Sequence, residues 1–171
     1  IERLEEWLDR LSSESFFAID TETTSVDYMS ARLVGVSFAV GVGEAAYLPL
    51  AHDYVGAPEQ VDFDKAIEAL KPVLENESIA KVGQNLKYDL SVLASHGLTL
   101  KGKLYDTMME SYVLNSIATR HNMDALARHY LGISTTSFED VAGKGASQLT
   151  FNQVPLDVAT DYAAEDADVT Y

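Results

Sequence analysis

The sequence predicts a mixed α/β fold in a single domain. Short apolar runs bounded by glycine or acidic residues indicate strands, leucines that recur every three or four positions indicate helices, and the two patterns alternate along the chain. Of the 171 residues, 47% are hydrophobic, which is enough for one sizeable core. No internal repeat or low-complexity linker interrupts the chain, so we expect residues 1–171 to form one domain.

The predicted elements begin with a helix and three strands. Leucines at helical spacing surround Trp7, and the break at Ser12 ends this helix. Three apolar runs then follow as strands, at residues 15–20, 32–40 and 45–50. A Gly-Val-Gly turn separates the last two strands, so we expect them to form a hairpin.

The rest of the chain predicts mainly helices. Apolar residues at helical spacing indicate helices around 67–74 and 86–93, with a short strand at 80–82 between them. Further helical segments follow at 106–115, at 122–130 and from 156 to the end. A polar, glycine-containing loop is expected at 143–150.

The composition excludes several kinds of site. With no cysteine, the chain has neither disulfides nor thiolate-bound zinc, and its four histidines lack metal-ligand spacing. Its net charge of −15 argues against tight nucleic-acid binding by the domain alone. Carboxylates that recruit divalent cations can nevertheless form a pocket that accepts phosphate.

The chain carries no signal of a membrane location. Its most apolar region, residues 33–50, is interrupted by glycines and Glu44, and no stretch resembles a signal peptide. We expect no membrane partner and a reducing, cytoplasmic setting. Because the chain begins without methionine and stops within a helical pattern, we expect it to be a segment of a longer polypeptide.

Two acidic residues close the first predicted strand. Asp20 and Glu22, in the run FAIDTETTS, are two positions apart, so both side chains leave the same face of a strand. An isolated acidic residue is usually solvated, whereas two carboxylates on one face supply a metal-ligand set. Whether Asp20 and Glu22 form a metal site therefore depends on acidic residues elsewhere in the chain.

Two further motifs repeat a spacing of four residues. Asn85 and Asp89 are expected on one face at a helix start, and Tyr162 and Asp166 on one face of the last helix. Hard cations such as Mg²⁺ prefer oxygen ligands, which this pool of carboxylates provides. Other acidic residues, such as Asp106, are expected to cap helices instead.

These motifs, in this order, resemble the Exo I, Exo II and Exo III motifs of the DEDD exonuclease superfamily, and Tyr162 resembles the tyrosine of the DEDDy branch. The linking sequences VGQNLKYD, DTMMESYVLNS and RHNMDALA are similar to the 3′→5′ proofreading exonuclease domain of bacterial family A DNA polymerases. The resemblance covers nearly the whole chain. It implies an RNase H-like fold, a mixed β-sheet flanked by helices.

The resemblance implies hydrolysis by two divalent metal ions, Mg²⁺ first and Mn²⁺ or Zn²⁺ as alternatives. Asp20, Glu22 and Asp166 would hold one ion, and Asp20 would bridge to a second ion held by Asp89. Tyr162 would orient the attacking water, because a tyrosine with a pKa near ~10 is a poor base at neutral pH.

The resemblance also implies contacts with the terminal nucleotides of the substrate. The residues at matching positions are Gln84, Asn85 and Tyr88 for the nucleotides and their phosphate, Arg120 for a backbone phosphate, Val26 as an apolar wedge, and Phe138 as a stacking ring. The wedge is leucine in many relatives, and valine is shorter. For Phe138, packing in the core is an alternative.

The expected partners are a single-stranded or frayed DNA 3′ end and a polymerase domain in the same bacterial parent chain. Two alternatives share the motifs. A free-standing 3′→5′ exoribonuclease would carry the same acids and tyrosine but prefer substrates with 2′-hydroxyls. A catalytically silent module would have lost the acids, all of which are present here.

Overall fold

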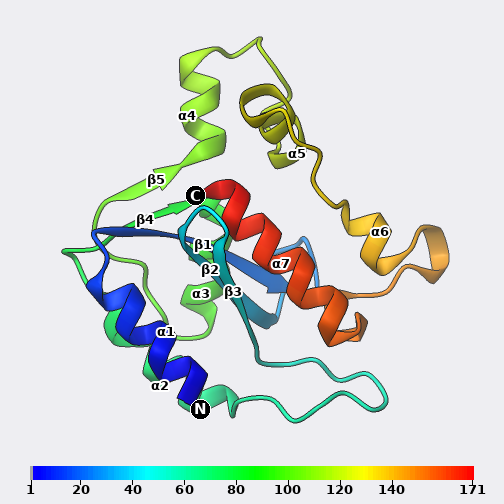
Figure 1. Ribbon diagram of the computed structural model, residues 1–171. Helices are drawn as coiled ribbons and strands as arrows, with labels where there is room; N and C mark the ends of the chain where they lie inside the picture. Colours follow the sequence, from blue (N-terminus) through cyan, green and yellow to red (C-terminus); the bar gives the residue numbers. More distant parts are fainter. Residues whose placement is uncertain (1) are drawn as a thin grey trace.

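The computed structural model describes residues 2–171 and shows one five-stranded mixed sheet (Figure 1). In spatial order the strands are β3 (Glu44–Pro49), β2 (Leu33–Gly41), β1 (Phe16–Thr23), β4 (Ala80–Gly83) and β5 (Leu104–Asp106). β1, β2 and β3 pair antiparallel, whereas β4 and β5 run parallel to β1. The predicted mixed α/β class and the β2–β3 hairpin are confirmed.

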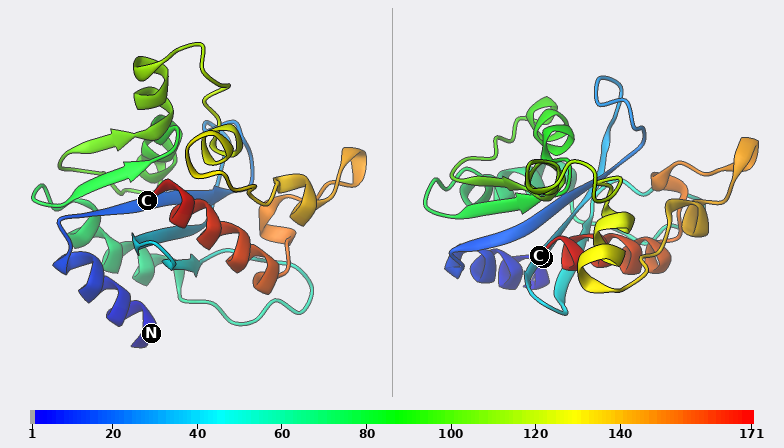
Figure 2. Two further views of the ribbon diagram at one scale, coloured as in Figure 1. Left: turned by 45° about the horizontal axis from the view of Figure 1, so that its top comes forward. Right: turned by 90° about the horizontal axis from the view of Figure 1, so that it is seen from above.

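The helices lie on both faces of this sheet. They are α1 (Glu2–Ser13), α2 (Phe63–Leu74), α3 (Leu86–Ser95), α4 (Thr107–Leu114), α5 (Met123–Leu126), α6 (Phe138–Ala142) and α7 (Leu156–Thr170). α2 and α3 cover one face, and α7 crosses the other (Figures 1 and 2). Among the helices described in residues 2–171, none is long and apolar enough to cross a lipid bilayer.

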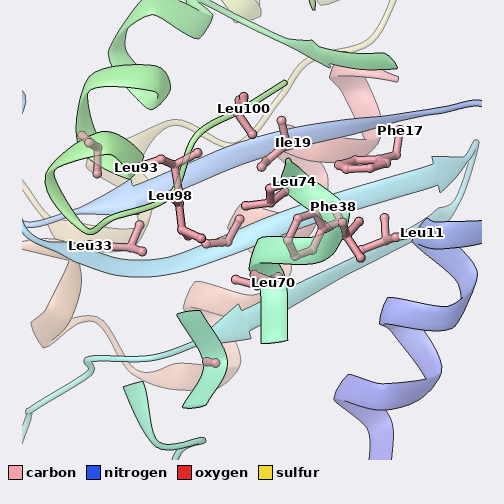
Figure 3. Packing of buried hydrophobic residues seen from close by; sticks show 14 of the residues in the cluster. Leu11, Phe17, Ile19, Leu33, Phe38, Leu70, Leu74, Leu93, Leu98 and Leu100 are labelled. Atoms are coloured by element: carbon pink, nitrogen blue, oxygen red, sulfur yellow. The ribbon is translucent and has the colours of Figure 1, made fainter. Parts of the chain in front are cut away.

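The main core lies between the sheet and the helices α1, α2 and α3. Phe17 and Ile19 of β1 point to this face together with Phe38 of β2, and they pack against Leu70 and Leu93 from the helices (Figure 3). All five side chains are at most 3% exposed. Strand alternation therefore sends the even-numbered residues of β1, including the two acids, to the opposite face.

Small residues line that opposite face. Ala18 and Ala39 from the sheet pack against Ala167 of α7, and none of the three is exposed. Alanine side chains allow a helix backbone to approach a sheet closely. α7 is thereby held near β1, and its polar residues come within reach of the strand.

Some elements differ from the sequence prediction. β1 extends to Thr23, so both acids lie inside the strand instead of at its end. The segment Leu104–Asp106 pairs with β4 as a strand that was not predicted, and Asp106 then caps α4 by accepting from the N–H groups of Met108 and Met109. Leu104 and Tyr105 lie between Lys103 and Asp106, so this segment offers no apolar run that would predict a strand.

The helix predicted at 122–130 is also different. α5 has four residues and continues as a wider π-helix over Ala127–Leu131, which ends at Gly132 in a left-handed conformation (φ 72°). The predicted loop at 143–150 is confirmed except for one short 3₁₀ turn, Gly145–Ser147. Helix α6, just before it, was not predicted, because five residues show no clear periodicity.

Candidate active site

Strand β1 places two carboxylates on the face that α7 covers. Asp20 lies opposite Ser37 of β2, and Glu22 lies opposite Gly35. Both acids therefore project on the same side of the sheet, as their spacing predicts. Glu22 is 8% exposed, and its Oε1 atom is buried without a hydrogen-bond partner among residues 2–171.

Helix α7 adds the third carboxylate. Asp166 is 9% exposed and lies beside Ala167, which packs on the sheet. One carboxylate oxygen from each of Asp20, Glu22 and Asp166 lies within 4.8 Å of the others. Three hard oxygen ligands at this separation, one of them buried without a partner, fit a divalent cation such as Mg²⁺.

Asp89 approaches the same strand from the other side. It lies in the first turn of α3 and is 2% exposed. Its Oδ1 atom accepts hydrogen bonds from the backbone N–H of Thr21, at 3.0 Å, and from the Thr21 hydroxyl. Thr21 was not predicted as a site residue, although its place between the two acids of β1 is a signal that points to it.

Crowding and burial oppose the ionisation of these four acids. Burial and then the charge of Asp89 raise the pKa of Asp20 well above its usual value, and burial and then Asp166 do the same for Glu22. Burial raises the pKa values of Asp89 and Asp166 to about 7. A bound divalent cation would reverse this balance, since it stabilises the ionised forms.

Tyr162 lies one turn before Asp166 on α7, beside its carboxylate. Burial, followed by the charges of Asp166 and Glu22, raises the pKa of Tyr162 far above neutrality. Its ring packs against Phe151, at 5.9 Å between ring centroids, and against Phe138, at 6.4 Å. The hydroxyl thus stays protonated and is fixed in place, which suits orientation of a water and not proton abstraction.

Two of the predicted substrate contacts, Gln84 and Asn85, lie directly before α3. Asn85 is exposed, but it lies before the helix in a left-handed conformation (φ 58°), so the prediction that it shares a helix face with Asp89 is wrong. The amide of Gln84 donates to the carbonyl of His121 at 2.8 Å and accepts from Thr107. These bonds tie the residue after β4 to the start of α4 and to the segment between α4 and α5.

The other predicted contacts lie on α3, on α6 and on two loops. The Tyr88 hydroxyl bonds with Thr23 and with the carbonyl of Ser25, next to Val26, which is 96% exposed. Arg120 is exposed between α4 and α5. Phe138 is half-buried against the Tyr162 ring, so packing accounts for part of its role. Binding of substrate by these residues stays a prediction.

A five-stranded mixed sheet with acids from β1, α3 and α7 gathered on it defines the class of RNase H-like exonucleases. Solved structures with a similar fold include the following two. Escherichia coli RNase D matches with a TM-score of 0.67 and 19% identity over 98% of this chain and 40% of its own. Brucella melitensis NrnC with bound Mg²⁺ matches with a TM-score of 0.62 and 23% identity over 93% and 69%.

More specifically, the chain belongs to the 3′-5′ exonuclease family of DNA polymerase I, whose sequence profile matches residues 1–171. It is 60% identical to DNA polymerase I of Pseudomonas aeruginosa over 96% of its length, and 42% identical to that of Rhizobium leguminosarum over 98%. The chain spans 18% of the length of each of these two relatives.

Proposed function

We propose that this domain removes nucleotides from DNA 3′ ends by hydrolysis that two divalent metal ions assist. The observation that carries the proposal is the convergence of carboxylates from β1, α3 and α7 beside Tyr162. Membership of the exonuclease family supports the 3′→5′ direction. The identity to DNA polymerases supports DNA over RNA as substrate.

The four carboxylates form two overlapping ligand sets in this mechanism. Asp20, Glu22 and Asp166 would hold one cation, and Asp20 and Asp89 would hold the second. Cations bound there would supply activation of water and neutralisation of charge on the leaving 3′ oxygen of an in-line displacement. Tyr162 orients the attacking water through its protonated hydroxyl, and Thr21 fixes the carboxylate of Asp89 by its two hydrogen bonds.

The same proposal covers the substrate and its setting. Gln84, Asn85 and Tyr88 hold the terminal nucleotides, and Arg120 binds a backbone phosphate. The apolar side chain of Val26 wedges between bases and Phe138 stacks on one, which favours frayed single strands without sequence preference. In a bacterial cytoplasm, as part of a longer chain with a polymerase domain, this activity would proofread newly made DNA.

Digestion of a 5′-labelled single-stranded DNA oligonucleotide tests the proposal. We expect a ladder that shortens from the 3′ end with Mg²⁺ or Mn²⁺ and disappears with EDTA. Asp20→Ala should lower the rate by more than about a thousandfold, since it removes the ligand shared by both cations. A matched RNA oligonucleotide should be cut more slowly, and faster cleavage of RNA would point to an exoribonuclease instead.

The control separates inactivity from misfolding. Asp157→Asn changes an exposed acid on the first turn of α7 and should retain the parental rate. If the folded parent chain bound metal but left DNA uncut, the proposed activity would have to be withdrawn for the isolated domain.

A further inference from the structure

A tyrosine on β3 lies on the same face of the sheet as the acids. Tyr47 pairs with Ser37 of β2, which in turn pairs with Asp20 of β1. Residues directly opposite in neighbouring strands project to the same side. Tyr47 is 9% exposed and packs against Phe151, the ring that also contacts Tyr162.

The Tyr47 hydroxyl occupies a space that only glycine leaves open. A Cβ atom on Gly35 would lie 2.2 Å from the Tyr47 Oη atom, so the hydroxyl stands where a side chain at position 35 would be. Gly35 is the cross-strand partner of Glu22. The hydroxyl therefore stands next to Glu22, near enough for the charge of that carboxylate to act on it.

His52 holds this hydroxyl in place. The Nε2 atom of His52 lies 2.9 Å from Tyr47 Oη, and its Nδ1 atom lies 3.2 Å from the carbonyl oxygen of Val154. A carbonyl only accepts, so in the neutral ring Nδ1 carries the hydrogen and Nε2 accepts from the tyrosine. The side-chain amide of Gln60 accepts from the backbone N–H of His52 and donates to the His52 carbonyl, so it holds the backbone of His52 in place.

We propose that Tyr47, held by His52, is a positioning residue for Glu22. Its hydroxyl fills the space over Gly35 and keeps the Glu22 carboxylate turned toward Asp20 and Asp166. The proposal rests on the metal-dependent function proposed above. Residues that orient metal ligands typically change metal affinity about 10- to 100-fold when they are replaced.

Tyr47→Phe tests this role, because it removes the hydroxyl and keeps the packed ring. The 171-residue chain is titrated with Mn²⁺, the free ion is followed by electron paramagnetic resonance, and the Mg²⁺ dependence of DNA cleavage is measured in parallel. We expect about tenfold weaker Mn²⁺ binding and a matching rise in the half-maximal Mg²⁺ concentration, with the rate largely recovered at saturating Mg²⁺.

Two further variants sharpen the test. Tyr54→Phe is the matched control, because it keeps the ring and removes a hydroxyl that accepts from the backbone N–H of Leu156. His52→Ala should weaken Mn²⁺ binding in the same direction as Tyr47→Phe. Parental Mn²⁺ affinity in Tyr47→Phe, or a lower melting temperature with unchanged affinity, would overturn the proposal.

The measurements distinguish failure of the proposed exonuclease function from failure of the role proposed for Tyr47. If the parent chain neither binds Mn²⁺ nor cuts DNA, the exonuclease assignment of this domain fails. If the parent does both and Tyr47→Phe matches it in every measurement, only the positioning role fails.

Discussion

At the scale of single residues, the site depends on polar side chains that hold the carboxylates in position. Thr21 gives Asp89 two hydrogen bonds from one residue of β1. Burial raises the pKa of Asp89, and the hydrogen bonds from Thr21 oppose that rise. Thr21 therefore favours the ionised form that a cation needs, and it also fixes the direction of the carboxylate.

Replacing Thr21 with valine should separate these effects from folding. Thr21→Val keeps the shape and the backbone hydrogen bond but removes the hydroxyl. We expect a loss of about tenfold or more in cleavage rate at low Mg²⁺, partly restored at high Mg²⁺ or higher pH. The measurement is the rate of oligonucleotide digestion over a grid of Mg²⁺ concentration and pH.

Thr170→Val is the matched control for this substitution. Thr170 is also a buried threonine, 8% exposed, and its hydroxyl has no hydrogen-bond partner in the described part of the chain. Its replacement should leave both the rate and its Mg²⁺ dependence unchanged. Equal behaviour of the two valine variants would contradict a specific role for Thr21.

At the scale of elements, the close contact between β2, β3 and α7 brings the site together. Small residues on the sheet, among them Ala39, allow α7 to approach and to carry Asp166 toward β1. Gly35 serves a related purpose, because its missing side chain leaves room for the Tyr47 hydroxyl. The arrangement therefore depends on the small residues alanine and glycine as much as on the polar residues of the site.

Gly35→Ala should therefore damage both the fold and the site. The new Cβ would meet the Tyr47 ring at 2.2–2.4 Å, and overpacking of this kind costs about 1–3 kcal/mol in the free energy of unfolding. Mn²⁺ affinity should fall as well, because the displaced ring no longer flanks Glu22. Urea denaturation and Mn²⁺ titration measure the two effects.

Gly41→Ala provides the comparison on the same strand. There the nearest atom to the new Cβ would be a side-chain oxygen of Glu44 at 3.4 Å, an ordinary contact. We expect little change in stability or Mn²⁺ affinity. A loss as large as that of Gly35→Ala would mean that any added methyl group disturbs β2.

At the scale of the whole molecule, the acids make folding and metal binding interdependent. In the metal-free protein, burial raises the pKa values of Asp89 and Asp166 to about 7, whereas in the unfolded chain such groups ionise near ~4. Between these values the folded chain binds more protons than the unfolded chain. The free energy of unfolding therefore falls as the pH rises from about 4 to about 7.

Divalent cations should restore this stability, and more so at higher pH. We expect Mg²⁺ to raise the melting temperature more at about pH 8 than at about pH 5.5, because it binds the ionised carboxylates. The difference should be a few degrees, since about 1 kcal/mol shifts the melting temperature by about 2–4 °C in a chain of this size. Calorimetry with Mg²⁺ or EDTA measures it.

A variant that lacks two of the four titrating acids checks the cause. Asp89→Asn combined with Asp166→Asn should weaken the pH dependence between these values and lower the Mg²⁺ effect, while Asp20 and Glu22 continue to titrate. A melting temperature that responds to Mg²⁺ equally at both pH values in the parent chain would refute the coupling.

The sequence by itself determined the mixed α/β class, the exonuclease family and the pairing of Asp20 with Glu22 on one face. These properties depend on local periodicity and on motif order, which one chain displays directly. Two short elements were not predicted, because β5 has only two apolar residues between charged neighbours and α6 has only five residues. Asn85 was misjudged, because its left-handed backbone takes it off the helix face that spacing alone assigned.

Only the tertiary structure decided which side chains lie beside the acids and hold them in position. Thr21 lies beside Asp89, 68 residues away, and the Tyr47–His52 pair contacts Val154 across more than 100 residues. No local pattern encodes such meetings, because they depend on how the sheet, α3 and α7 pack. The raised pKa values of the acids have the same origin, since burial exists only after the helices close over the sheet.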